Sequence, residues 1–161
     1  MGLSSDILEA QFGPTELEVL KQNLFYRLSR TYTVATGQNL ELSAVSFVAE
    51  TVGLFPEVEK LMRGGMSMGK AFRSQSLPFE RREQSVRRIE VTPELSKFFG
   101  IDGPCTVVLV TIVAGEVQYA HIFEVYSPAV YWEGARESRP TLVDEEKFKQ
   151  LATDLAKVKT A

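Results

Sequence analysis

A long apolar β-hairpin constrains this chain more than any other feature of its sequence. Residues Cys105–Val113 and Glu116–Tyr126 are rich in β-branched and aromatic side chains, which favour strands. Between them, Ala114-Gly115 suits the two-residue turn that joins neighbouring antiparallel strands. The sequence therefore predicts an antiparallel sheet in which the second strand of this hairpin is central.

One acidic residue, Glu124, interrupts the apolar second strand of the hairpin. Strand alternation places it on the same side as Ala120, Ile122 and Tyr126. A lone carboxylate in such surroundings is costly to bury, so it is either paired with a nearby arginine or kept for a ligand. Both interpretations remain open, and Glu124 is the first candidate site residue.

Other local signals predict helices around this sheet. Thr15 and Glu18 fit a capping box, and leucines at helical spacing then predict a helix to about Thr36. The remaining predicted elements are a strand over 39–48, helices over 56–62, from Ser67 and over 93–99, an extended segment over 84–91, and a last helix from Asp144. We expect α+β architecture: a single domain over 1–161 with one twisted antiparallel sheet and helices on one face. Residues 1–13 are then a loose lead-in, and 133–161 a linker with the C-terminal helix.

Composition excludes several classes of partner. The chain has 161 residues, of which 44% are hydrophobic and 24% charged, as in ordinary globular proteins. A formal net charge of -3 offers no field for nucleic acid, and the longest apolar runs are far too short to span a membrane. The N-terminus has no basic start followed by an apolar run, so we expect no secretory signal and a cytoplasmic location. We therefore expect neither nucleic acid nor membrane as a partner.

Cysteine and histidine are too scarce for most metal or thiol chemistry. Cys105 is the only cysteine, so the chain has no internal disulfide and no multi-cysteine metal site. His121 is the only histidine, so a zinc site would need mostly carboxylates, and we expect no metal. No motif supports a catalytic pair of Cys105 with His121.

A series of short motifs carries a resemblance to a known family. In chain order these are Leu28–Thr31, Ala35–Gly37, Gly69–Arg73, Arg82-Glu83, Pro93–Leu95, Phe98–Ile101, Gly115-Glu116 and Phe123–Pro128. Over most of residues 20–130 they resemble the chorismate pyruvate-lyase family, in its archaeal and bacterial branch. The effector-binding domains of some bacterial winged-helix repressors share that fold, with a similar hairpin ending in Glu-x-Tyr-x-Pro.

The resemblance implies both a pocket and a reaction. The pocket would hold a small aromatic or cyclohexadienyl carboxylate, and the reaction would convert chorismate to 4-hydroxybenzoate and pyruvate without a cofactor. By position, Glu124 matches a glutamate that contacts the hydroxyl end of the ligand. On the same resemblance, the candidate substrate-binding residues are Leu28, Ser29, Met68, Gly69 and Tyr126.

One departure from the family separates three hypotheses. Family members carry two further strands, which supply a carboxylate-binding arginine, where residues 49–66 of this chain indicate a loop and a short helix. Arg82 is the first candidate for the catalytic role of that arginine, and Arg73 and Arg88 are alternatives. The chain is then a lyase, a non-catalytic ligand-binding or interaction protein on the same fold, or an effector sensor whose DNA-binding partner is a separate chain. The sheet edge left by missing strands would suit a homodimer.

Overall fold

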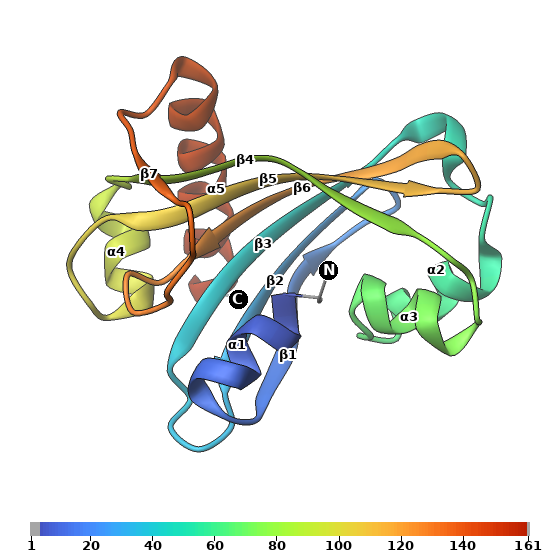
Figure 1. Ribbon diagram of the computed structural model, residues 1–161, viewed down its shortest axis with the longest axis horizontal. Helices are drawn as coiled ribbons and strands as arrows, with labels where there is room; N and C mark the ends of the chain where they lie inside the picture. Colours follow the sequence, from blue (N-terminus) through green and yellow to red (C-terminus); the bar gives the residue numbers. More distant parts are fainter. Residues whose placement is uncertain (1–3, 161) are drawn as a thin grey trace.

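A seven-stranded sheet forms the centre of the computed structural model, which describes residues 4–160 and their side chains to residue 158. The strands lie in the order β1-β2-β3-β6-β5-β4-β7 (Figure 1). Their bounds are Thr15–Gln22 (β1), Tyr26–Thr33 (β2), Asn39–Phe47 (β3), Glu80–Ile89 (β4), Cys105–Ala114 (β5), Val117–Tyr126 (β6) and Arg136–Glu137 (β7). All pairs are antiparallel except the short β4–β7 pair. The predicted α+β fold, with its central hairpin of β5 and β6, is confirmed.

Most helices form where the sequence predicts them, although not every predicted cap forms. They are α1 (Ser4–Phe12), a 3-10 turn η1 (Ala49–Thr51), α2 (Pro56–Arg63), α3 (Met68–Ser74), α4 (Pro93–Phe99) and α5 (Leu142–Thr160). The side chain of Ser67 caps α3 by accepting a hydrogen bond from the Lys70 amide at 3.4 Å. In α5, the predicted apolar residues Phe148, Leu151 and Leu155 are buried. Local sequence therefore predicts α2, α3, α4 and α5, although the Thr92 side chain makes no capping hydrogen bond and α5 begins at Leu142, before the predicted cap Asp144.

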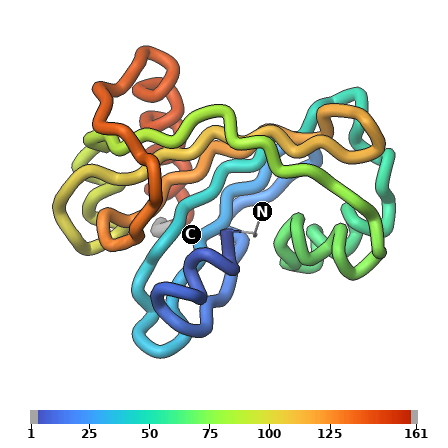
Figure 2. The backbone as a smooth tube through the Cα atoms, viewed as in Figure 1, coloured from blue at the N-terminus to red at the C-terminus, as the bar shows by residue number. Residues whose placement is uncertain are grey.

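Alternation along β5 and β6 divides the apolar core into two clusters. Val108 and Val110 share one cluster with residues of α1, α2 and α3, whereas Val107 and Phe123 share the other with residues of α4 and α5. We name the two sides of the sheet the Glu124 face and the Phe123 face, because these neighbours on β6 point in opposite directions. The tube in Figure 2 shows α1 and α3 together on one side of the strands, with α4 and α5 at the other end of the sheet.

The helix predicted over residues 15–36 is wrong, because this segment forms the β1–β2 hairpin. The Asn23 side chain accepts a hydrogen bond from the Phe25 amide at 2.9 Å, which is the local turn that asparagine favours. Across the hairpin, Arg30 Nε donates to Glu18 Oε1 at 2.7 Å. Glu18 is therefore part of a cross-strand ion pair and not of a capping box.

This hairpin adds two strands that the sequence patterns do not predict. Residues 49–66 do form a loop, η1 and α2, as predicted, but β1 and β2 precede β3 and enlarge the sheet. The predicted loose lead-in over 1–13 is wrong from Ser4 onward, because α1 buries Leu8 completely against the core. Residues 1–3 lie outside the described part of the chain. In the predicted linker, β7 adds a short parallel strand beside β4.

Cys105 and His121 lie apart on the central hairpin. Cys105 is fully buried opposite Ile89, whereas His121 pairs with Thr111, six residues farther along β5. Burial raises the pKa of the Cys105 thiol to about 12, so it behaves as a small apolar side chain. Within residues 4–160, no three His, Cys, Asp or Glu side chains gather as a metal site would require. No helix in that range has the length and apolar character needed to cross a membrane.

Candidate functional site

Glu124 is buried and held on both of its carboxylate oxygens. Arg81 on β4 donates from Nη1 to Oε2 at 2.7 Å and from Nη2 to Oε1 at 2.5 Å, and the Tyr126 hydroxyl donates to Oε1 at 2.9 Å. Burial lowers the pKa of Arg81 while the Glu124 charge raises it, and the net shift is upward. The two side chains therefore form a bidentate arginine–carboxylate ion pair. Of the two interpretations of Glu124, the structure shows the arginine-paired one.

A second carboxyl group, Glu41 on β3, lies beside this pair. It opposes Tyr126 in the sheet register, is 3% exposed, and accepts a hydrogen bond from Thr31 Oγ1 at 3.2 Å. Burial first, and then the charge of Glu124, raise the pKa of Glu41 to about 8. Glu41 is therefore mainly protonated at neutral pH and contributes little negative charge.

A second arginine, Arg27 on β2, is buried on the same face without a counter-ion. Its side chain is among the largest that are fully buried, and Nη1 donates to the carbonyl of Met66 at 2.7 Å and to that of Met62 at 3.4 Å. Among the described residues, Nε has no hydrogen-bond partner and no carboxylate forms an ion pair with the guanidinium. Burial lowers the pKa of Arg27 to about 10, so it remains a cation at neutral pH. Such an uncompensated buried charge is costly to keep.

A small cavity connects these groups on the Glu124 face. It has a volume of about 90 Å³ and lies between the sheet and the N-terminal ends of α1 and α3. Its lining includes Arg27, Arg81, Glu41, Glu124 and the hydroxyls of Ser29 and Thr31. With Glu41 protonated, these buried groups carry one net positive charge. The cavity is well below the roughly 300 Å³ of small ligand pockets, so it suits one anionic group of a ligand. We call it the Arg27 site.

The structure places most of the residues predicted to bind substrate around this site. Ser29, Met68 and Gly69 line the cavity together with Glu124. Tyr126 reaches it indirectly, through its hydrogen bond to Glu124. Leu28 does not line it: alternation turns this side chain to the Phe123 face, where it packs in the cluster of α4 and α5.

Arg82 lies away from the Arg27 site, and its neighbour Arg81 occupies the expected place. The guanidinium of Arg82 is exposed and hydrogen-bonded to Glu80 at 2.9 and 3.1 Å. Counting alternate residues back from Val86 would place Arg82 on the Glu124 face. A bulge at Gln84 inserts one extra residue in β4, so that Arg81 faces Glu124 instead. The sequence carries no clear signal for this bulge.

The other candidate arginines also fail to reach the cavity. Arg73 lies 3.6 Å from Asp6, and Arg88 lies 3.7 Å from Glu137, both near the surface. Arg27 was not a candidate, because the sequence placed it in a helix. Its signal was the run of aromatic and β-branched residues that follows it in β2, which favours a strand.

Comparison with known proteins reveals similarity only at the level of structure. No protein-family model matches the chain, and no curated protein matches it. The C-terminal domain of the histidine utilization repressor from Pseudomonas syringae aligns with a TM-score of 0.55 at 13% identity, over 78% of this chain and 99% of that chain. The ligand-binding domain of a protein assigned to the GntR family of transcriptional regulators, from Bordetella bronchiseptica, gives 0.56 at 12% identity, over 73% and 88%. PhnF from Mycobacterium smegmatis gives 0.58 at 12% identity, over 88% and 68%.

These alignments show a shared fold. The chain has the chorismate lyase-like fold of the C-terminal, ligand-binding domains of GntR-family regulators. They support the repressor-domain part of the sequence resemblance, whereas membership of the chorismate pyruvate-lyase family is not shown. At 12–13% identity, no residue role passes from these proteins to this chain.

Proposed function

We propose that this protein is a non-catalytic binding domain that senses a small organic anion at the Arg27 site. The observation that carries the proposal is the buried guanidinium of Arg27, which has a free Nε–H and no counter-ion among the described residues. An anion there would supply the charge and the acceptor that the fold lacks. The shared fold with ligand-binding domains of transcriptional regulators supports a sensory role.

The lining of the site favours a carboxylate or a similar oxyanion. A guanidinium offers parallel N–H groups that match two anionic oxygens, and the hydroxyls of Ser29, Thr31 and Ser43 are close by. The body of the ligand would extend past the Met68-Gly69 turn, because the cavity itself holds little more than the anionic group. A small aromatic or cyclohexadienyl carboxylate, as the resemblance implies, is therefore the first ligand class to test.

Binding without turnover fits this geometry better than lyase chemistry does. In the lyase hypothesis Glu124 contacts the substrate, but here Arg81 and Tyr126 engage both of its oxygens. We therefore place chorismate among the test ligands and expect neither 4-hydroxybenzoate nor pyruvate to form from it.

Thermal unfolding and isothermal titration with 4-hydroxybenzoate, chorismate and inorganic phosphate test the proposal. A ligand that binds only the folded state at 100 times its Kd adds about 2.7 kcal/mol to the free energy of unfolding. We expect an oxyanion to raise the melting temperature of the native protein, and Arg27→Met to abolish that rise. Arg82→Met is the matched control, because it removes an exposed arginine from the opposite face.

Two results would overturn the proposal. One is unchanged ligand binding in Arg27→Met, with the variant folded by circular dichroism. The other is release of pyruvate from chorismate that Glu124→Gln abolishes, which would establish a lyase.

Cytoplasmic location and a homodimer through a sheet edge stay predictions. Residues 49–66 form no strand, and the long free edge of the sheet is β1. Glu16, Glu18 and the bulge after Val19 on this strand would hinder pairing with a second copy. Light scattering over a range of concentrations tests whether a dimer forms.

A further inference from the structure

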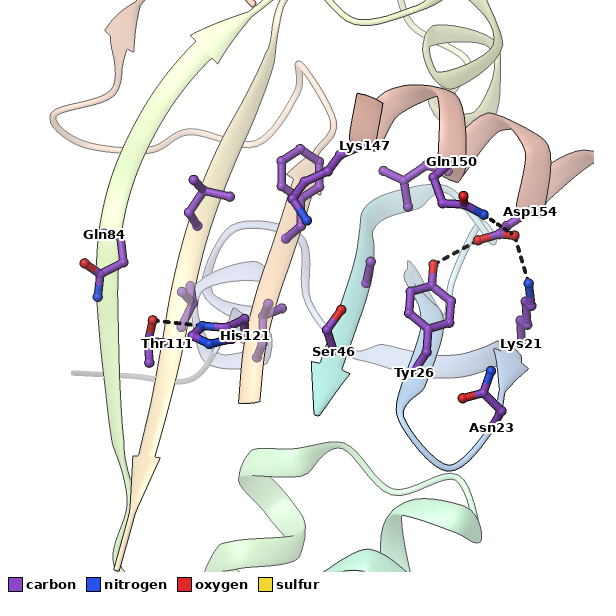
Figure 3. Close-up of a pocket in the computed structure, with 16 residues that line it drawn as sticks. Lys21, Asn23, Tyr26, Ser46, Gln84, Thr111, His121, Lys147, Gln150 and Asp154 are labelled. Carbon is purple, nitrogen blue, oxygen red and sulfur yellow. Dashed lines mark hydrogen bonds and ion pairs between the residues drawn. The ribbon is translucent and has the colours of Figure 1, made fainter. Parts of the chain in front are cut away.

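A second, larger cavity lies on the opposite face of the sheet from the Arg27 site. It has a volume of about 760 Å³, within the range of about 300–1,000 Å³ typical of small-molecule sites. Figure 3 shows α5 along one side of it, and labelled residues from Gln84 on β4 to Lys21 on β1 across its floor. We call it the α5 groove.

The floor of the groove is apolar and crosses several strands. It is made by Ala44 on β3, Leu109 on β5 and Phe123 on β6, with Leu151 of α5 at its side. These side chains belong to or pack on the core cluster beneath α4 and α5. A flat apolar molecule would cover them, as α5 covers the neighbouring part of the same face.

One wall of the groove has its charges satisfied internally. Asp154 of α5 is fully buried and accepts hydrogen bonds from Lys21 at 3.0 Å, from the Tyr26 hydroxyl at 3.0 Å and from Gln150 at 3.1 Å. Figure 3 shows these contacts gathered at one end of the cavity. The charge of Lys21 is therefore already neutralised, and this wall offers no free cation to a ligand.

Lys147, two turns before Asp154 on the same helix, supplies an unneutralised charge. Its Nζ lies 5.4 Å from the centroid of the Phe123 ring, directly beside the apolar floor. Among the described side chains, it makes no ion pair with a carboxylate. An ammonium group over an aromatic floor favours a ligand with a π-system and an anionic substituent.

We propose that the α5 groove binds an amphipathic organic anion. Its flat, fused-ring or aromatic body lies on Leu109 and Phe123, and its carboxylate or sulfonate contacts Lys147. This site is distinct from the Arg27 site, because the two cavities lie on opposite faces of the sheet. The proposal therefore stands or falls independently of the proposed function.

A pair of matched probes tests the proposal by NMR titration of the full chain. 2-Naphthoate carries the fused ring and the carboxylate, whereas 2-naphthamide carries the same ring without the charge. We expect 2-naphthoate to shift the amide resonances of residues 121–123 and 147–151 with saturation, and to bind about fivefold more tightly than 2-naphthamide.

Four variants test which residues contact the carboxylate and the ring of the probe. Lys147→Gln is expected to weaken the binding of 2-naphthoate about fivefold and to leave the binding of 2-naphthamide unchanged. Lys149→Gln, an exposed lysine of the same helix outside the groove, is the matched control and should change neither. Ala44→Leu should block both probes by filling the floor, with its folding checked by the dispersion of the spectrum. Arg27→Met should retain binding in the groove.

Three outcomes would overturn the proposal. Equal affinity for the two probes would show that no anion is selected. Resonance shifts confined to the surroundings of Arg27 would place 2-naphthoate in the other site. The third outcome is self-association of the chain that covers the groove and is abolished by Lys147→Gln. It would show that a second copy of the chain, and not a small anion, occupies the groove.

Discussion

The two faces of the sheet differ in how completely their buried charges are paired within the chain. On the Glu124 face, two arginines and two carboxyl groups line a small cavity of about 90 Å³ and carry one net positive charge. On the Phe123 face, Asp154 is fully satisfied by its neighbours, and the free charge of Lys147 remains at the surface of a cavity of about 760 Å³. The small, charged cavity selects a ligand mainly by its charge, whereas the larger cavity selects it mainly by its apolar surface.

The largest effect is expected where a buried charge loses its partner. Arg81→Met leaves Glu124 buried without its ion pair, and we expect the free energy of unfolding to fall by about 3–5 kcal/mol. Urea denaturation of the variant measures this loss. The exposed control Arg82→Met should change it by less than about 0.5 kcal/mol. Equal losses in the two variants would contradict the asymmetry between the faces.

Replacing both members of that pair sharpens the same comparison. The double variant Arg81→Met/Glu124→Leu removes both charges at once, and we expect it to recover most of the stability that Arg81→Met loses. Denaturation under the same conditions measures the recovery. A double variant as unstable as the single one would show that packing, and not an unpaired charge, caused the loss.

A smaller effect on the free energy of unfolding is expected from a change of pH, because Glu41 titrates. Its pKa rises from the ordinary 4.5 to about 8 on folding, so between these values the folded chain holds a proton that the unfolded chain has released. The free energy of unfolding should therefore fall as pH rises, by about 2 kcal/mol from pH 5.5 to 7.5. Denaturation across this range measures the slope. Glu41→Gln should flatten it, and a slope that persists in this variant would assign it to another group.

The smallest effect is expected on the Phe123 face. Asp154→Asn keeps the size of the side chain but removes its charge, and Lys21, at 38% exposed, can turn to water. We expect a loss of about 1 kcal/mol in denaturation experiments, with no change in Glu146→Gln on the same helix. A loss as large as that of Arg81→Met would show that both faces depend equally on buried charge.

Local patterns predicted those parts of the fold that depend on local chemistry. Proline and serine at helix starts located α2, α3 and α4, and alternation in the central hairpin correctly oriented Glu124. The first hairpin was missed because leucine spacing in residues 17–28 fits a helix as well as a strand pair. Only the long-range pairing of β2 with β3 decides between these alternatives.

The candidate site was predicted in part for the same reason. Ser29, Met68 and Gly69 were identified through the family resemblance, and Glu124 first from its place on the apolar strand; all four line one cavity. The arginines were not, because Arg81 owes its orientation to a one-residue bulge and Arg27 to a strand that the sequence did not reveal. Both depend on backbone pairing across the sheet, which side-chain patterns do not specify.

Arg27 also has a mechanical consequence. The carbonyls that accept hydrogen bonds from its Nη1 belong to Met62 at the end of α2 and to Met66 just before α3. An anion on the free Nε would leave those hydrogen bonds in place and hold the guanidinium from both ends. The ligand would then hold the sheet and this pair of helices at a fixed separation. We expect a bound anion to reduce the motions of residues 56–74 and to change their average structure little.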